Sequence, residues 1–481
     1  MAPDAYARHH DYDLICIGSG PAGQRGAVQA AKLGKRVAIV ERQRYVGGVC
    51  LHTGTIPSKT FREAVLSYAN IANGLSSGVV DRRGMPGTGA RGGRMRPSAE
   101  VLFGRVGRIV EREVNVQDDQ LARNGVDVLE GTAEFTDPHS LRIESLQGSR
   151  NVSSDNFLVA VGTRPCPPRG FAIDGRHVIT SDEIFGIEEI PRSVVVIGCG
   201  VIGIEYASML AALGVSVTVV DGRDRPLEFL DREIVDELVH QMRDRGVVFR
   251  LGETVQSVDV KVNGRRTVVV ALESGKRLAA ELAIVCAGRV GATDGLGLDA
   301  AGLMADDRGR LTVDENFRTS VPHIFAAGDV IGYPSLAATS SEQGRLAACG
   351  VFGINAKPMS EHFPIGVYAV PEISMVGASE HELTAKKIPY ETGVARFREI
   401  ARGQILGDNT GFLKMNFHRE TRQLLGVHAI GTGATELIHI GQCVFALGGG
   451  LDYFLETVFN YPTLAECYKV AALDAHNKLL L

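Results

Sequence analysis

The pattern of apolar and polar residues repeats in two long segments of the chain. Residues 13–41 and 193–221 each begin with an apolar run, pass through closely spaced glycines into an alanine-containing apolar stretch, and end in β-branched residues. A continuous apolar run bounded by glycine predicts a buried strand, and the stretch after the glycines is typical of a helix. Each segment is therefore expected to form a strand, a turn, a helix and a second, parallel strand.

The two segments represent an internal duplication with an offset of 180 residues, from Gly18 to Gly198. This offset is far longer than the period of about 20–50 residues that marks solenoid repeats. In both segments an acidic residue, Glu41 or Asp221, follows the third glycine by 18 positions. The chain is expected to contain two dinucleotide-binding domains.

The rest of the chain has a weaker pattern. A helix is expected over residues 98–123, a buried strand and turn over 157–165, and strand pairs followed by helices from about residue 361. The apolar run 194–220 is long enough to cross a membrane, but its glycines favour a buried strand–helix–strand unit. The polar residues 1–13 predict no secretory signal, and we expect a cytoplasmic protein.

Composition narrows the function classes. Lys and Arg number 51 and Asp and Glu 56, giving a net charge of −5, which provides no electrostatic basis for wrapping nucleic acid. Eight cysteines in 481 residues are too few for a disulfide scaffold. Many of the 57 glycines have a positional role, although those within 71–97 lie in an Arg-rich surface excursion. An RNA contact of the RGG type is the alternative interpretation of that tract.

The glycines of the first turn each meet a different physical need. Gly18 allows the tight turn, Gly20 lets the backbone approach a pyrophosphate, and Gly23 lets the helix pack on the strand. The phosphate then lies at the helix N-terminus, where amide donors and the helix dipole favour an anion. Glu41 ends the second strand and is placed to bind a ribose. In the second segment the equivalent residues are Gly198, Gly200, Gly203 and Asp221.

The second turn leaves the choice of nucleotide open. Asp221 favours the free 2′-hydroxyl of NAD, because a carboxylate repels a 2′-phosphate. Arg223 and Arg225 follow within reach of such a phosphate. They are interpreted either as solvated loop residues or as part of a site that admits both NAD and NADP.

Four further motifs carry a resemblance to a known family. They are GGVCLHTGTIPSK (47–59), VGTRP (161–165), HIFAAGDVIG (323–332) and FNYPTLAE (459–466). With the two glycine turns, they resemble the flavoprotein disulfide reductases over nearly the whole chain. The resemblance implies an α/β fold with two Rossmann-like dinucleotide-binding domains and a C-terminal α/β dimerisation domain, and hence a homodimer or higher homo-oligomer.

The resemblance also implies boundaries and roles. Residues 1–165 and 290–358 are expected to bind FAD, 166–289 to bind NAD(P), and 359–481 to form the interface. Asp329 falls on the aspartate that binds the ribityl chain of the flavin. Lys59 and Glu205 fall on the catalytic ion pair beside flavin N5. The cofactor contacts implied are Gly18, Gly20, Gly23, Glu41, Arg42, Gly47, Gly48, Val49, Cys50, Thr55, Lys59, Ala133, Gly162 and Asp329 for FAD, and Gly198, Gly200, Val201, Ile202, Gly203, Asp221, Arg223, Arg225 and Gly288 for the nicotinamide nucleotide; no metal is expected.

Two departures from the family pattern carry the prediction of function. The family has two cysteines separated by four residues, whereas this chain keeps Cys50 and has Thr55 at the second position. The family's catalytic His before Pro-Thr is replaced by Tyr461, while the orienting Glu466 remains. A threonine cannot form a disulfide, and a tyrosine with a pKa of about 10 is a poor substitute for a histidine of about 6.5. Both changes affect the thiol half-reaction alone.

One reaction needs only the groups that remain. Exchange of a hydride between NADPH and NAD⁺ through a bound flavin consumes no proton and uses no thiol. The combination of GTIPSK with FNYPT resembles the soluble pyridine nucleotide transhydrogenases of bacteria, which implies a transhydrogenase of the Si-specific type. The alternatives are an NAD(P)H diaphorase or quinone reductase, a dihydrolipoamide dehydrogenase-like flavoprotein, and a non-catalytic flavoprotein that senses NAD(P)H.

Overall fold

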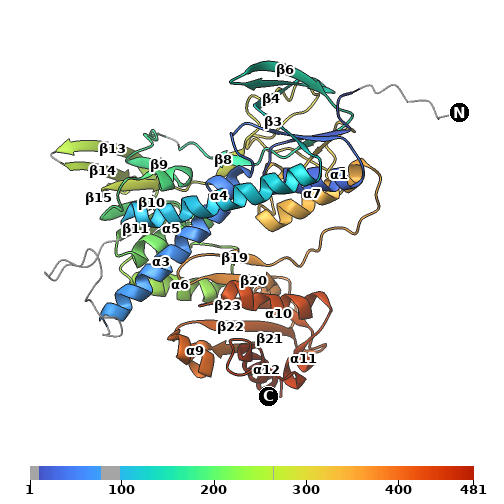
Figure 1. The fold of residues 1–481 in the computed structure, drawn as a ribbon. Coiled ribbons are helices and arrows are strands. Elements are labelled where there is room, and N and C mark those ends of the chain that lie inside the picture. Colours follow the sequence, from blue (N-terminus) through green and yellow to red (C-terminus); the bar gives the residue numbers. More distant parts are fainter. Residues whose placement is uncertain (1–9, 77–97, 169, 264, 481) are drawn as a thin grey trace. The chain divides into compact units, whose positions relative to one another are not determined.

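The computed structural model describes residues 10–76, 98–168, 170–263 and 265–480. The chain forms two compact units (Figure 1). The first combines Met1–Phe61, Val101–Pro167 and Gly288–Met359; the second combines Arg62–Glu100, Pro168–Ala287 and Ser360–Leu481. Each unit is therefore built from segments that are distant in sequence.

The first unit is centred on a five-stranded parallel sheet of order β18-β7-β1-β2-β3. Strands β1, β2 and β7 are buried at every position, as expected for a parallel sheet that is covered on both faces. The strands are β1 (Leu14–Ile17), β2 (Val37–Glu41), β3 (Asp127–Glu130), β7 (Phe157–Val159) and β18 (Ile324–Ala326). The apolar run at the start of the chain thus forms the central strand.

Helices α1 (Pro21–Lys32) and α7 (Ala337–Val351) pack closely on this sheet. Their approach depends on two glycines, because a Cβ at Gly344 would lie 2.0 Å from the carbonyl oxygen of Ala22 and a Cβ at Gly26 would lie 2.4 Å from Leu158. The other helices that begin or end in this unit are α2 (Gly48–His52), α3 (Thr55–Ser76) and α4 (Ala99–Arg123). The helix expected over 98–123 is thereby confirmed.

The predicted surface excursion begins later than expected. Residues 71–76 continue helix α3, so the prediction of an irregular segment from residue 71 was wrong for these six residues. Gly74 costs a helix about 1 kcal/mol relative to Ala, but the long helical stretch that begins at residue 55 continues through it. Residues 77–97, which carry the rest of the Gly- and Arg-rich tract, lie outside the described residues.

Two small antiparallel sheets complete the first unit. One is formed by β4 (Thr132–Asp137), β5 (Ser140–Ser145) and β6 (Gly148–Ser153). The other pairs β8 (Thr163–Pro165) with β17 (Arg289–Gly291). This second pair, with the short 3₁₀ turn Asp329–Ile331, brings three distant segments together at one end of the unit.

The second unit repeats the parallel architecture in the order β12-β11-β10-β16-β9. The strands are β9 (Val178–Thr180), β10 (Ser193–Ile197), β11 (Ser216–Asp221), β12 (Val248–Leu251) and β16 (Leu282–Val285), with helices α5 (Val201–Ala212) and α6 (Arg232–Asp244) and the 3₁₀ turn Ser181–Gly186. An antiparallel sheet, β13 (Val255–Asn263), β14 (Arg265–Leu272) and β15 (Arg277–Ala280), accompanies it. The duplication predicted from the sequence is thus a repeated strand–helix–strand unit.

The C-terminal part of the second unit is an antiparallel sheet of order β19-β20-β23-β22-β21. Its strands are β19 (Ile365–Val367), β20 (Ile373–Gly377), β21 (Tyr390–Arg396), β22 (Phe412–His418) and β23 (Leu424–Ile430), and its helices are α8 (Glu380–Ala385), α9 (Ala401–Leu406), α10 (Ala434–Ala446), α11 (Leu451–Glu456) and α12 (Glu466–Leu479), with the 3₁₀ turn Phe397–Glu399. Helix α10 lies along β20 and β23, and α12 packs on β21 and β22 (Figure 1). The expected change to strand pairs and terminal helices is confirmed.

The long apolar run 194–220 forms β10, α5 and β11. Helix α5 is apolar on all sides and is buried from Gly203 to Ala211, as a helix inside a protein core should be. Within the described ranges, no helix combines the length and the apolar character needed to span a bilayer.

Candidate functional site

The first glycine turn has the geometry that a bound phosphate needs. Gly18 has φ +102°, and a Cβ at Gly23 would lie 1.9 Å from the carbonyl oxygen of Gly18, so both positions require glycine. A Cβ at Gly20 would meet nothing within 4 Å. Among the described residues, no side chain caps helix α1 at Gly20, which leaves its first amide groups available to an anion.

The second turn repeats this geometry almost atom for atom. Gly198 has φ +114°, and a Cβ at Gly203 would lie 2.0 Å from the carbonyl oxygen of Gly198. The residues before the two helices, Gly20 and Gly200, have φ/ψ of −66°/−178° and −73°/−175°. Val201 and Ile202 form the first turn of α5 and are partly exposed. Both turns therefore fit the pyrophosphate of a dinucleotide.

The acid at the end of β2 is held inside a hydrogen-bonded chain. Glu41 is 5% exposed and accepts hydrogen bonds from the amide (3.1 Å) and hydroxyl (2.5 Å) of Ser19 and from the amide of Gln43 (2.9 Å). The Ser19 hydroxyl in turn accepts from the amide of Gly47 at 2.9 Å. These hydrogen bonds join the first turn to the segment that contains Gly47 and Gly48. Arg42, the residue after Glu41, is exposed.

Ser19 was not among the residues predicted for the site. Its only signal in the sequence was its position between the first two glycines, and its link to Gly47, 28 residues away, depends on the folded structure.

The acid at the end of β11 is paired with an arginine. The guanidinium of Arg223 donates to both carboxylate oxygens of Asp221, at 2.7 and 3.0 Å, and the amide of Arg223 donates at 2.8 Å. Burial raises the pKa of Asp221, but these hydrogen bonds and that of the Cys199 amide outweigh burial and hold the pKa well below its usual range. Arg225 instead forms an ion pair with Asp236.

The predicted redox segment places Thr55 beside Cys50. Cys50 lies in α2 and Thr55 begins α3, with the Thr55 side chain near the Cys50 thiol. Burial raises the pKa of the Cys50 thiol, and the Thr55 hydroxyl offsets this in part. Lys59, one turn further along α3, donates to the hydroxyl of Ser58 at 3.2 Å. A hydroxyl near Cys50 thus stands where the family motif has its second cysteine.

A polar cluster surrounds Asp329 in the first unit. Its carboxylate is approached by the hydroxyls of Ser340 and Thr163, at 3.4 and 3.5 Å, and Thr163 accepts a hydrogen bond from Arg289 at 2.9 Å. Burial raises the pKa of Asp329, and the charge of Arg289 opposes that shift. Sequence reasoning missed Arg289 and Thr163 as members of this cluster, although Thr163 lies within the VGTRP motif.

Three other predicted residues lie in this same unit. Gly162 and Gly288 have φ of +65° and +97°, and a Cβ at either would meet nothing within 4 Å. Ala133 lies on β4 and is 7% exposed. The open space at Gly20 and Gly162, together with the Asp329 cluster, fits a dinucleotide such as FAD bound along the first unit.

Glu205 is buried in the apolar helix α5, where it is 3% exposed. Its carboxylate accepts a hydrogen bond from the amide of Tyr368 at 2.8 Å, in the loop after β19. A buried carboxylate needs such donors, because its charge is costly away from water.

The replacement for the family's catalytic histidine is exposed. Tyr461 is 71% exposed and precedes a cis proline, and Glu466 begins α12 five residues later.

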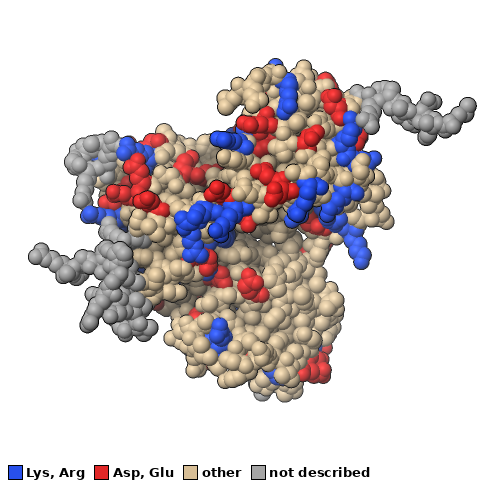
Figure 2. All heavy atoms as spheres, in the orientation of Figure 1, with Lys and Arg blue, Asp and Glu red and all other residues tan. Residues whose placement is uncertain are grey.

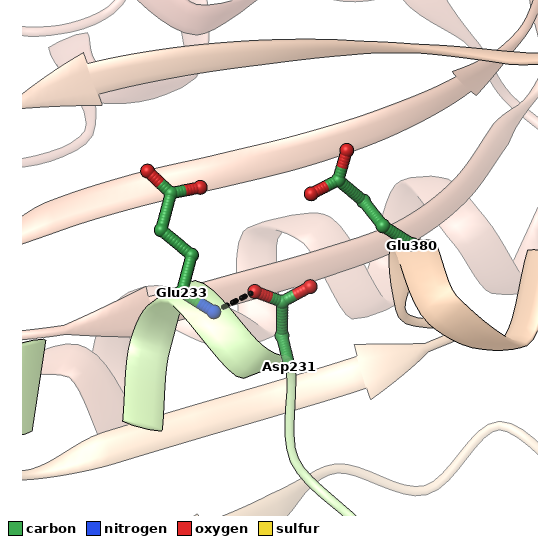
Figure 3. A group of neighbouring side chains, drawn as sticks. All are labelled: Asp231, Glu233 and Glu380. Atoms are coloured by element: carbon green, nitrogen blue, oxygen red, sulfur yellow. Dashed lines mark hydrogen bonds between the residues drawn. The ribbon is translucent and has the colours of Figure 1, made fainter. Parts of the chain in front are cut away.

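One group of carboxylates resembles a metal site. Asp231, Glu233 and Glu380 turn their side chains toward one another (Figure 3), and among the described residues this is the one such group. The ammonium of the fully buried Lys414 bonds all three, with distances of 3.0 Å to Asp231 and to Glu233. A lysine therefore already provides the cation that these carboxylates need.

The glycine turns at Gly18 and Gly198, with segment 47–59 between them in the sequence, are typical of one class of protein, the dinucleotide-binding oxidoreductases. The family described as pyridine nucleotide-disulphide oxidoreductase matches residues 12–344, and its dimerisation domain matches residues 363–472. The chain belongs to this family, which confirms the expected fold class.

Individual relatives within the family narrow the comparison to one group of enzymes. The chain is 50% identical over 98% of its length to soluble pyridine nucleotide transhydrogenases of Mycobacterium bovis and Mycobacterium tuberculosis, and covers 98% of each. It is 40% identical to the soluble pyridine nucleotide transhydrogenase of Photobacterium profundum, with coverage of 97% and 98%. The resemblance predicted from GTIPSK and FNYPT is confirmed.

Solved structures agree on the fold. LpdA from Mycobacterium tuberculosis has a TM-score of 0.85 at 26% identity and covers 96% of this chain and 99% of its own. The HOCl-induced flavoprotein disulfide reductase RclA from Escherichia coli gives the same TM-score, identity and coverage.

Proposed function

We propose that this protein is an FAD-dependent transhydrogenase that exchanges reducing equivalents reversibly between NADPH and NAD⁺. The observation that carries the proposal is Thr55 beside Cys50, because the nucleotide turns are intact while the thiol pair is lost. When bound, FAD supplies the redox centre that exchanges a hydride equivalent with a nicotinamide ring. The net reaction, NADPH + NAD⁺ to NADP⁺ + NADH, is balanced without a proton or a thiol.

The first unit supplies the flavin-binding groups. The amides at the start of α1 and the open space over Gly20 bind the pyrophosphate, and Glu41 binds the adenosine ribose through lone pairs left beside Ser19. Asp329, held by Ser340 and Thr163, orients the ribityl chain. The remaining flavin contacts proposed are Arg42, Gly47, Gly48, Val49, Cys50, Thr55, Lys59, Ala133 and Gly162.

The second turn binds the two nicotinamide nucleotides in alternation. Gly198, Gly200 and Gly203 with the start of α5 bind the pyrophosphate, and Gly288 lies where the chain returns to the first unit. Lys59 and Glu205 are proposed as the charged groups that orient the reacting rings.

Arg223 explains how one site accepts both nucleotides. Paired with Asp221, its guanidinium cancels the negative charge that would otherwise repel a 2′-phosphate. When NADP(H) binds, the same guanidinium is available to the phosphate; when NAD(H) binds, Asp221 is available to the 2′-hydroxyl. Arg225 adds positive charge nearby.

A homodimer formed through the C-terminal part is the proposed assembly. On the face drawn in Figure 2, the C-terminal strands and helices carry few charged side chains. Leu447 and Val458, in the C-terminal part of the chain, are 86% and 89% exposed, which suits a surface that a second copy covers.

The three domain boundaries expected from the sequence stay a prediction. We also propose a cytoplasmic location, because all eight cysteines are described and none is in a disulfide.

The two half-reactions test the function separately. The holoenzyme is mixed with NADPH without oxygen, the visible absorbance of the bound flavin is followed as it bleaches, and NAD⁺ is then added. Bleaching by NADPH and full recovery with NAD⁺, with formation of NADH, is the expected result. A flavin that NADPH bleaches but only a quinone restores would favour a diaphorase instead.

A further inference from the structure

The loop between β19 and β20 has buried and part-buried backbone groups that bond to side chains rather than to a neighbouring strand. Such groups need a partner, and here each is bonded by a side chain from another segment of the same unit. The amide of Tyr368 donates to Glu205, the carbonyl of Ala369 accepts from Arg62 at 2.9 Å, the amide of Val370 donates to Ser208 at 3.0 Å, and the carbonyl of Val370 accepts from Arg245.

Two of these four partners lie on one helix. Glu205 and Ser208 are three residues apart on α5, and side chains at this spacing share a helix face. The loop therefore attaches to α5 at two points, through amides two residues apart. Arg62 and Arg245 bind the carbonyls of Ala369 and Val370, and Arg62 is itself fixed by an ion pair with Glu372 at 3.2 Å.

The hydroxyl of Ser208 is suited to this attachment. Ser208 is fully buried, and its hydroxyl donates to the carbonyl of Glu205 at 2.8 Å. With its one proton directed at that carbonyl, the oxygen presents its lone pairs to the amide of Val370. A side chain without this oxygen would leave the Val370 amide buried and unpaired.

We propose that Ser208 is a positioning residue for Glu205: its hydroxyl anchors the loop so that the amide of Tyr368 stays on the Glu205 carboxylate. The inference rests on the role proposed above for Glu205. Without the anchor, the loop shifts away from α5, and the carboxylate loses a donor that stabilises its charge at 3% exposure.

The test compares Ser208→Ala with a matched control, Ser374→Ala. Ser374 is also buried, 1% exposed, and its hydroxyl donates to the carbonyl of Ile365 in the same sheet. Both holoenzymes are mixed rapidly with NADPH and the reduction of the bound flavin is followed. Amide hydrogen exchange at Tyr368 and Val370 gives a readout that is independent of activity.

Ser208→Ala is expected to slow flavin reduction about tenfold and speed exchange at both amides, while Ser374→Ala leaves both readouts unchanged. In a Glu205→Gln background, Ser208→Ala should cause no further slowing. If Ser208→Ala does not fold, Ser208→Cys, which keeps the size but weakens the acceptor, should move the readouts in the same direction.

Two results would overturn the proposal. One is a rate within about twofold of wild type in Ser208→Ala, and the other is equal slowing with Glu205 and with Gln at position 205. Failure of the proposed function is distinguishable, because it is measured on wild-type transfer from NADPH to NAD⁺. Flavin reduction that depends on Ser208 can persist in a protein that lacks that transfer.

Discussion

Arg223 binds the carboxylate of Asp221 through two guanidinium nitrogens, which lie 2.7 and 3.0 Å from its two oxygens. In the function proposed above, this pair neutralises an acid that would otherwise favour NAD and supplies a cation for a 2′-phosphate. Because Arg223 is 43% exposed, the energy of the pair itself is modest, and its effect on ligand choice is the larger consequence.

Replacing Arg223 should therefore separate the two nucleotides. Arg223→Ala leaves Asp221 unpaired, and KM for NADPH is expected to rise about tenfold or more while KM for NADH changes less than about twofold. Steady-state kinetics with each nucleotide measures this. Arg225→Ala is the control, and a smaller effect is expected because Arg225 is paired with Asp236. Equal losses for NADPH and NADH in Arg223→Ala would show that Arg223 does not bind the 2′-phosphate.

The thiol of Cys50 should react slowly at neutral pH. Burial raises its pKa, and the neutral thiol, which burial favours, is a poor nucleophile. Alkylation of Cys50 followed by mass spectrometry should be slower than that of the exposed Cys443 at pH 7, with the gap narrowing as the pH rises above the ordinary thiol range. Cys50 reacting as fast as Cys443 at pH 7 would contradict this account of its environment.

Restoring the second cysteine should allow a disulfide to form with Cys50 without restoring the reduction of external disulfides. The side chain of residue 55 lies near Cys50, so Thr55→Cys is expected to form a disulfide that thiol titration detects. Reduction of an external disulfide should stay at background, because position 461 carries a tyrosine in place of the imidazole that serves as the family's catalytic base. The double variant Thr55→Cys/Tyr461→His is the matched comparison. Disulfide reduction by Thr55→Cys alone would disprove the role assigned to the residue at 461.

Replacing Lys414 should destabilise the protein, because its ammonium neutralises the carboxylates around it as a bound cation would. Lys414→Met leaves Asp231 buried at 2% exposure without its ammonium partner, and the free energy of unfolding is expected to fall by about 3 kcal/mol. Lys276→Met, which removes the partner of Glu253 from a half-exposed position, is the control, and a much smaller loss is expected. Chemical denaturation measures both.

A related measurement addresses the metal question directly. Treatment of the wild-type protein with a chelator should leave its thermal midpoint unchanged, because the ammonium of Lys414 already bonds the three carboxylates. A midpoint that falls with chelator and recovers with a divalent cation would mean that a metal, rather than Lys414 alone, stabilises the group.

The sequence predicts best what is encoded locally. The strand–turn–helix–strand order around Gly18 and Gly198 is continuous in the chain, and the pattern of apolar runs and glycines was enough to predict it. The proximity of Thr55 to Cys50 follows from their spacing at the start of a helix.

Contacts between distant segments could not be predicted in this way. Ser19 binds Gly47 across 28 residues, and the loop at Tyr368 binds Glu205 across 163 residues. The Lys414 cluster joins residues that no periodicity connects, because sheet order and loop path decide which side chains meet. A lysine within the strand FLKMNFH gave no sign in the sequence that it is fully buried.

The central claim is that the flavin passes reducing equivalents between two nicotinamide nucleotides without a thiol. The most direct measurement mixes the purified holoenzyme with NADPH and a spectrally distinct NAD⁺ analogue, with quinones and disulfides absent. The account predicts catalytic reduction of the analogue, in amounts that match the NADPH consumed, and reduction that continues after Cys50 is replaced by Ser. No reduction of the analogue alongside rapid reduction of an added quinone would contradict it.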